Sequence, residues 1–82
     1  MYFVYFVRSQ QDDSVYVGYT DDLDKRLKQH NQGKTRSLKC KLPVRLIYCE
    51  AYLSKTVARK REIQFKKNWS EKEKVLKRIK NI

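Results

Sequence analysis

The stretch SVYVGYTDDLDKRLKQH, residues 14–30, changes its hydrophobic period half-way and decides how the rest of the chain is interpreted. Its first part places apolar side chains at every second position, a period that predicts a strand. Over residues 21–30 the apolar positions follow a helical period instead, with Leu23 and Leu27 on one stripe. The sequence therefore predicts a strand that leads directly into an amphipathic helix.

Two side chains of this helix lie beside its apolar stripe rather than on the outer face. Arg26 and His30 are four residues apart, and His30 is the only histidine in the chain. A helical wheel directs both at the edge of the core. Thr20 or Asp21 is available as the N-cap of the helix.

The residues before this stretch complete a β-hairpin. Residues 2–8 carry aromatic and β-branched side chains on both faces, which is typical of a central strand covered on both sides. The polar turn of residues 9–13 joins the two strands. Tyr5 and Tyr16 are expected to fall nearly opposite each other, within one residue of register, so that their side chains converge.

The residues after it add one strand and two helices. Asn31 and Gly33 close the first helix, and a basic loop with one helical turn follows up to Leu42. A third strand is predicted over residues 44–52. Ser54 caps a helix that runs to about Asn68, and the capping-box pattern of residues 70–73 starts the last helix. The residues expected to face inward are Val57, Ala58, Phe65 and Trp69 in the first of these helices and Val75, Leu76 and Ile79 in the second.

This order, ββαβαα, predicts an α+β fold in which a small three-stranded antiparallel sheet is flanked by helices. At 82 residues the chain is expected to form a single domain, residues 1–82. The apolar run at the N-terminus is too short to span a bilayer, so we expect no membrane partner. Cys40 and Cys49 fit no zinc pattern, and reduced thiols in a cytoplasmic protein are the default.

The charge balance indicates a polyanionic partner. The chain has twenty lysines and arginines and nine acidic residues, which gives a net charge of +11. Such an excess destabilises the compact state unless an anion compensates it, and nucleic acid is the first candidate. A merely solvated basic surface is the alternative. The residues expected to contact nucleic acid are Lys34, Arg36, Lys39, Lys41 and Lys66.

Several short motifs, in this order and at these spacings, resemble the GIY-YIG nuclease domain family. They are Phe3-Val4-Tyr5, Tyr16-Val17-Gly18, Arg26-Leu27 with His30-Asn31, Thr35-Arg36-Ser37, and Arg61-Glu62 with Lys66. The likeness covers nearly the whole chain and is greatest to the small stand-alone bacterial branch of YhbQ-like proteins and to the related nuclease module of the bacterial excinuclease. Phe3 stands where the family name has Gly, and Val17 where it has Ile.

The resemblance implies a metal-dependent endonuclease that hydrolyses phosphodiester bonds in DNA, structure-dependent and linked to DNA repair or recombination. RNA is an alternative substrate, a protein partner is expected to supply target choice, and the oligomeric state stays open. In this interpretation Glu62 holds a single Mg²⁺ or Mn²⁺ that otherwise keeps its waters. Arg26 presents a planar fork of donors that matches phosphate oxygens.

The same interpretation assigns catalytic roles to the phenols and the imidazole. Tyr5 or Tyr16, with a lowered pKa, orients or deprotonates the attacking water. His30, whose ordinary pKa lies near neutrality, relays a proton or holds a tyrosine in place. The general base stays open among these three residues.

Each candidate also has a structural interpretation. Tyr5 and Tyr16 could be ordinary strand aromatics, and His30 a core or capping residue. Arg26 could pair with Asp22, and Glu62 with Lys66. Gly18 could mark a bulge or a close backbone approach. The alternative function is a non-catalytic basic nucleic-acid-binding module, or an adaptor, on the same fold.

Overall fold

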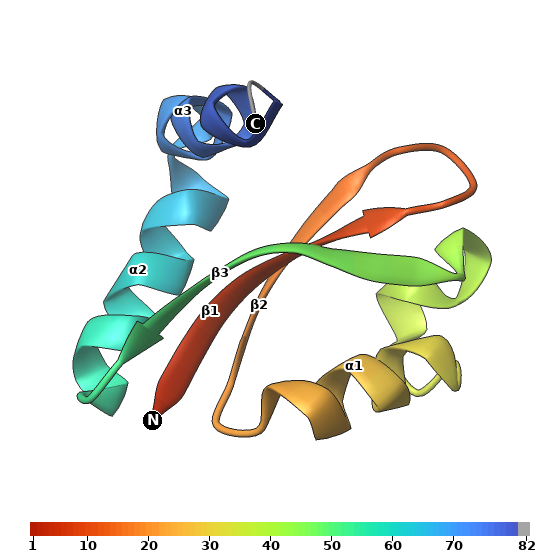
Figure 1. Cartoon of the computed structure of the whole chain (residues 1–82), viewed down its shortest axis with the longest axis horizontal. Coiled ribbons are helices and arrows are strands. Elements are labelled where there is room, and N and C mark those ends of the chain that lie inside the picture. The colour runs from red at the N-terminus through yellow and green to blue at the C-terminus, as the bar shows by residue number, and fades with distance from the viewer. Residues whose placement is uncertain (81–82) are drawn as a thin grey trace.

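The computed structural model describes residues 1–80, and these form the predicted ββαβαα order with one short 3₁₀-helix added (Figure 1). The elements are β1 (Tyr2–Ser9), β2 (Val15–Thr20), α1 (Leu23–Asn31), the 3₁₀-helix η1 (Arg36–Lys41), β3 (Val44–Tyr52), α2 (Lys55–Lys67) and α3 (Trp69–Lys80). The α+β class is therefore confirmed. The helical turn expected in the basic loop is η1, which buries Leu38.

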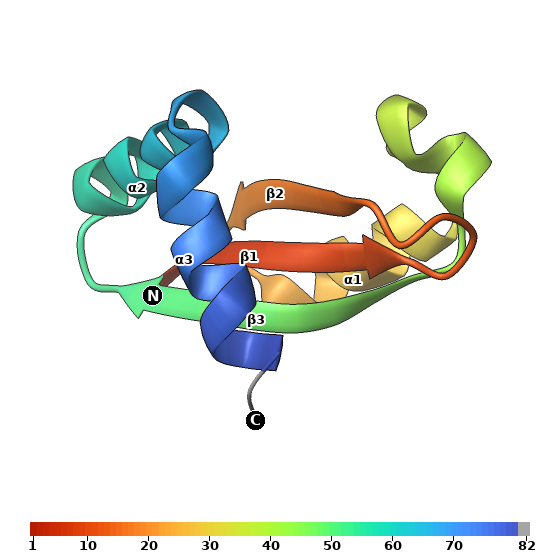
Figure 2. The same ribbon diagram turned by 90° about the horizontal axis from the view of Figure 1, so that it is seen from above.

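One antiparallel sheet with the strand order β2-β1-β3 separates two sets of helices. Figure 1 shows α1 on one side of the sheet and α2 with α3 on the other, and Figure 2 shows α3 crossing the strands. The prediction that the first strand is covered on both faces is confirmed. Val4 and Phe6 belong to the core under α2 and α3, whereas Tyr5 and Val7 belong to the core on the α1 side.

The predicted register of the hairpin is wrong. Tyr5 pairs with Gly18, and Tyr16 pairs with Val7, so the two tyrosines are two residues out of register. The reason is that β1 continues to Ser9, whose amide donates to Ser14 O at 2.9 Å and closes the turn there. Both tyrosines still lie on the α1 face of the sheet, because a shift of two residues preserves the alternation of a strand.

The N-cap of the first helix lies one residue after the later of the two predicted N-caps, Thr20 and Asp21. Asp22 is the N-cap, and its side chain accepts from the Lys25 amide at 3.1 Å. Thr20 ends β2 instead, and its hydroxyl accepts from the Asp22 amide. The predicted C-terminal signal is present: Gly33 follows the helix with φ of +79°, a conformation that glycine adopts without strain.

The predicted cap of α2 is confirmed, because Ser54 Oγ accepts from the Val57 amide at 3.3 Å. Of the four residues predicted to face inward, two are buried and two are exposed. Ala58 and Phe65 are buried, but Val57 is 48% exposed and Trp69 is 67% exposed. The chain leaves the helix at Asn68, whose φ and ψ of −116° and 99° are extended. Trp69 therefore starts a new helix and does not continue the stripe of α2.

Asn68, and not Ser70 of the predicted capping box, caps the N-terminus of the last helix. Its Oδ1 accepts from the Ser70 amide at 3.1 Å and from the Ser70 hydroxyl at 3.0 Å. Downstream, Val75 is buried while Leu76 and Ile79 pack against the same core, as predicted. Across residues 1–80, the helices are too short or too polar to cross a membrane.

Candidate active site

A buried chain of hydrogen bonds connects β1, α1 and the loop after α1. Tyr5 Oη lies 2.6 Å from His30 Nε2, and His30 Nδ1 lies 2.5 Å from Thr35 Oγ1. Tyr5 and His30 are both 0% exposed. Both ring nitrogens of the histidine are thus occupied, which fixes the orientation of the ring. Thr35 was not predicted as part of the site, although it belongs to the Thr35-Arg36-Ser37 motif.

Gly18 provides the room for the tyrosine of this chain. A Cβ built on Gly18 would lie 2.3 Å from Tyr5 Oη and 2.4 Å from Tyr5 Cζ. The tyrosine ring therefore rests directly on the backbone of the neighbouring strand, which only glycine permits. Of the two structural interpretations offered for Gly18, the close backbone approach is the one found.

Asn31 attaches the same end of α1 to the sheet through a contact that no local sequence signal indicates. Its Oδ1 accepts from the Val44 amide at 2.8 Å, and its Nδ2 donates to the Val44 carbonyl at 3.0 Å. The side chain thus pairs with the first residue of β3 as another strand would. This clamp holds the last turn of α1, and with it His30, against the sheet.

Burial moves the pKa values of the hydrogen-bonded pair away from neutrality. Burial, assisted by the charge of Arg26, lowers the pKa of His30 to about 4. Burial raises the pKa of Tyr5 to about 12, although Arg26 opposes the shift. A lowered pKa was predicted for Tyr5 or Tyr16, and for Tyr5 that prediction is wrong. The pKa of His30 is shifted well below its ordinary value near neutrality. Near pH 7 both side chains are neutral.

Tyr16 reaches the same histidine from the edge strand. Its ring meets the His30 ring edge-on, with centroids 5.6 Å apart, and the Tyr5 ring lies 5.7 Å from the same imidazole. Unlike Tyr5, Tyr16 is only partly buried, and Lys66 Nζ lies 5.8 Å from its ring centroid. The expected convergence of the two phenols is therefore present despite the different register, with the imidazole between them.

Arg26 lies beside the buried pair, since its charge influences the pKa of both Tyr5 and His30. Its Nη1 donates to Gln29 Oε1 at 3.3 Å. Within residues 1–80 the alternative ion pair with Asp22 is not formed, and the Asp22 carboxylate accepts from the Lys25 amide at the start of the helix instead. The guanidinium is thus half-buried at the margin of the core, next to Tyr5.

Glu62 approaches this group from α2. Its side chain is only 12% exposed; Oε2 accepts from Lys66 Nζ at 2.9 Å, and Oε1 lies 3.7 Å from Arg59 Nε. Its charge is near enough to contribute to the raised pKa of Tyr5. The suggested ion pair with Lys66 is therefore present. Within residues 1–80, no group of three or more His, Cys, Asp or Glu side chains could hold a metal ion.

The sequence model of the GIY-YIG catalytic domain matches residues 1–77. The chain belongs to the GIY-YIG family. It is similar to the UPF0213 protein YazA of Bacillus subtilis, with 45% identity over 67 residues that cover 80% of this chain and 67% of that protein. A UPF0213 protein of Bacillus licheniformis is 44% identical over 64 residues, which cover 77% of this chain and 66% of the relative. The solution structure of the UPF0213 protein BH0048 from Bacillus halodurans is 34% identical, with a TM-score of 0.60, and the match covers 94% of this chain and 84% of that one.

In this GIY-YIG domain the two name-giving segments hold each other in place. The last residue of the first segment, Tyr5, packs on the last residue of the second, Gly18. The five predicted site residues come from β1, β2, α1 and α2. Tyr5 and Tyr16 contact His30 directly, whereas Arg26 and Glu62 lie near enough to influence the pKa of Tyr5. Their catalytic roles remain predictions.

The predicted nucleic-acid contacts of the GIY-YIG chain differ in how available they are. Lys34, Arg36 and Lys39 are exposed. Lys41 is paired instead: its Nζ lies 3.2 Å from Asp12 Oδ2 and donates to Ser14 Oγ at 2.9 Å. Lys66 is paired with Glu62, as described above.

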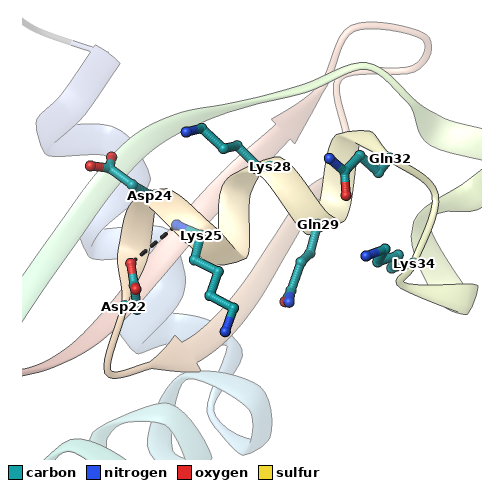
Figure 3. A pocket seen from close by; sticks show the side chains of 7 residues that line it. All are labelled: Asp22, Asp24, Lys25, Lys28, Gln29, Gln32 and Lys34. Atoms are coloured by element: carbon teal, nitrogen blue, oxygen red, sulfur yellow. Dashed lines mark hydrogen bonds between the residues drawn. The ribbon is translucent and has the colours of Figure 1, made fainter.

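A hollow of about 390 Å³ lies on the outer face of α1 (Figure 3). It is lined by Asp22, Asp24, Lys25, Lys28, Gln29, Gln32 and Lys34. Its charges are mixed, and none of the five predicted catalytic residues lines it. This hollow is therefore separate from the candidate active site.

Proposed function

We propose that this protein is a metal-dependent endonuclease that hydrolyses phosphodiester bonds in DNA, with a preference for DNA structure and a role in repair or recombination in the cytoplasm. The observation that supports it best is the meeting of Tyr16, Arg26 and Glu62 around the buried Tyr5–His30 pair in a GIY-YIG domain. These three are the partly exposed members of the group, so they are the ones a substrate can meet.

Hydrolysis requires a water oxygen to attack phosphorus while the bond to the leaving oxygen breaks. One proton must leave the water, and one must reach the leaving alkoxide. Tyr16 is the phenol that orients this water or takes its proton, because Tyr5 is fully buried with a pKa near 12. Solvent water supplies the proton that the leaving alkoxide takes up. Arg26 binds the phosphoryl oxygens with its fork of donors and stabilises the charge that grows on them.

Tyr5 and His30 are positioning residues in this scheme. His30 is neutral and held at both nitrogens, and its ring supports Tyr16 edge-on. A rigid imidazole under the phenol fixes where the Tyr16 hydroxyl lies relative to the phosphate. Such preorganisation lowers the barrier without any proton leaving the buried pair.

Glu62 is the residue that would hold a divalent cation, Mg²⁺ or Mn²⁺. When bound, this cation supplies positive charge that stabilises the phosphoryl and leaving oxygens. The carboxylate suits it, because carboxylate oxygen is a ligand that Mg²⁺ prefers and Glu62 is only partly buried, with its two oxygens now held by Lys66 and Arg59 at 2.9 Å and 3.7 Å. Lys66 then has to move aside, which frees its ammonium for a phosphate of the substrate. A single carboxylate is a usual number of protein ligands for Mg²⁺ in a phosphate site.

The decisive experiment compares cleavage by wild type, Glu62→Gln and Arg26→Ala. Duplex, nicked, flapped and single-stranded DNA are incubated with Mg²⁺, Mn²⁺ or EDTA. We expect products only with metal and a loss of about 10²-fold or more in each variant. Glu73→Gln, which removes the same charge from α3, is the matched control and should cut normally. Equal cleavage by wild type and both site variants would refute the proposed site.

A non-catalytic nucleic-acid-binding module, or an adaptor that needs a protein partner, is the second candidate. The Glu62–Lys66 ion pair favours it, since that pair satisfies the carboxylate without a metal. This function predicts metal-independent binding without product. The affinity should fall by orders of magnitude between ~50 and ~200 mM salt if several phosphates are contacted.

A further inference from the structure

The only tryptophan of the chain, Trp69, is 67% exposed at the junction of α2 and α3. Tryptophan side chains are usually well buried, because they carry a large apolar surface. Here the break of the helix at Asn68 removes the ring from the core. An exposed aromatic ring in a strongly basic protein is a surface on which a nucleobase can stack.

Trp69 lines an open hollow of about 420 Å³ that reaches the candidate active site. Tyr16 of that site lines the same hollow. So do Lys66, which is ion-paired with Glu62 of the site, and Lys67 and Lys72. No carboxylate lines it, in contrast to the hollow on α1 (Figure 3). The charge of this groove is therefore complementary to an anionic strand.

Lys72 holds the tryptophan ring in place. Its Nζ donates to the Val15 carbonyl of β2 at 3.1 Å and lies 5.5 Å from the Trp69 ring centroid. The ammonium is thus fixed to the sheet on one side and attracted to the indole on the other. The ring is consequently a preformed platform, which reduces the entropy lost when a base stacks on it.

We propose that this hollow binds one unpaired nucleotide of a DNA strand, with its base stacked on Trp69 and its flanking phosphates at Lys66 and Lys67. This nucleotide would lie next to the phosphate that is cleaved, because the hollow borders Tyr16; that part of the inference rests on the proposed function. Bases inside a continuous duplex are stacked on one another and offer no face to the indole. Substrates with an unpaired segment, such as flaps and single strands, are therefore preferred over continuous duplex.

Fluorescence tests the stacking directly, because Trp69 is the single tryptophan. The full chain is titrated in EDTA, so that nothing is cut, with a short oligothymidylate, an abasic oligonucleotide of the same length and a continuous duplex. We expect strong quenching by oligothymidylate and little by the other two. Trp69→Ala should bind oligothymidylate about 5- to 150-fold more weakly, and Trp69→Phe should regain much of the affinity. Leu53→Ala, which alters another exposed apolar residue, is the control and should bind as wild type does.

Salt dependence separates stacking from charge. Trp69→Ala should keep the slope of the affinity against salt, whereas Lys67→Gln should reduce it by about 0.7. Equal affinity of wild type and Trp69→Ala, or equal quenching by the abasic strand, would overturn the inference. Base-dependent quenching without cleavage under any metal would refute the proposed endonuclease and leave the stacking site standing. If Trp69→Ala cleaves DNA with the same substrate preference as wild type, the stacking site is refuted and the proposed endonuclease stands.

Discussion

Replacing Gly18 by alanine tests whether the two tyrosine-bearing segments hold each other in place. The added methyl would lie 2.3 Å from Tyr5 Oη, 2.4 Å from Cζ and 2.9 Å from Cε1. Ordinary van der Waals contact begins at 3.4 Å, so the ring has to move by about 1 Å. The ring has little room to do so, because it is fully buried and its hydroxyl is bonded to His30 at 2.6 Å.

The cost follows from three contributions. Overpacking a filled core costs ~1–3 kcal/mol. Weakening the buried hydrogen bond to His30 costs a further ~1–3 kcal/mol. The smaller conformational freedom of alanine in the unfolded chain returns ~0.5–1 kcal/mol. We therefore expect Gly18→Ala to lower the free energy of unfolding by about 1–5 kcal/mol. Each kcal/mol lowers Tm by about 4–8 °C in a domain of this size.

Urea denaturation followed by far-UV circular dichroism measures this change; the exposed Trp69 is a poor probe of the core. The same substitution in a Tyr5→Leu background should cost far less, because the rigid ring is gone. Gly33→Ala is the control: its cost arises from a φ of +79° and should be the same in both backgrounds. If Gly18→Ala costs under ~0.5 kcal/mol, or costs the same with and without the ring, the reasoning is wrong.

Two other substitutions probe the buried polar groups. Because burial lowers the pKa of His30 from 6.5 to about 4, the unfolded chain binds a proton more readily, and wild type should lose up to ~1.4 kcal/mol per pH unit as the pH falls from 6.5 to 4. His30→Gln should remove this part of the slope in urea denaturations across that range; an unchanged slope would show that His30 is not buried in its neutral form. Glu50 accepts hydrogen bonds from Tyr48, from Tyr52 and, at 2.8 and 3.1 Å, from Arg61, which bind α2 to β3. Glu50→Gln should therefore lower the free energy of unfolding by ~1–3 kcal/mol while Glu73→Gln changes it by less than ~0.5 kcal/mol, and equal values for the two would contradict this role.

The fold could be predicted because its signals are local. The change of period near residue 20, the Ser54 cap and Gly33 after α1 each depend on a few neighbouring residues. Such signals determine where an element starts and which of its faces is apolar. The end of α2 near Asn68 was predicted as well. These signals fail for Trp69, because its exposure depends on how α3 packs after the break, and that packing is not a local property.

The candidate site was only partly predictable. The family motifs identified five residues, of which Tyr5 and Tyr16 contact His30, while Arg26 and Glu62 influence the pKa of Tyr5. Thr35 and Asn31 were missed as supports because their partners, His30 Nδ1 and the Val44 backbone, depend on how the loop after α1 folds back. The direction in which the pKa of Tyr5 shifts was predicted wrongly, because burial determines the shift. The burial of the ring depends on all the segments that pack around it.

By itself the sequence determined the order of the elements, the basic charge and the set of chemically active side chains, since periodicity, capping and composition are properties of the chain alone. Only the tertiary structure decided that Tyr5 rests on Gly18, that His30 is neutral and that Trp69 lies in the open beside Tyr16. The physical reason is that register, burial and solvent access arise from segments far apart in the chain, and each of them is settled only when those segments pack together.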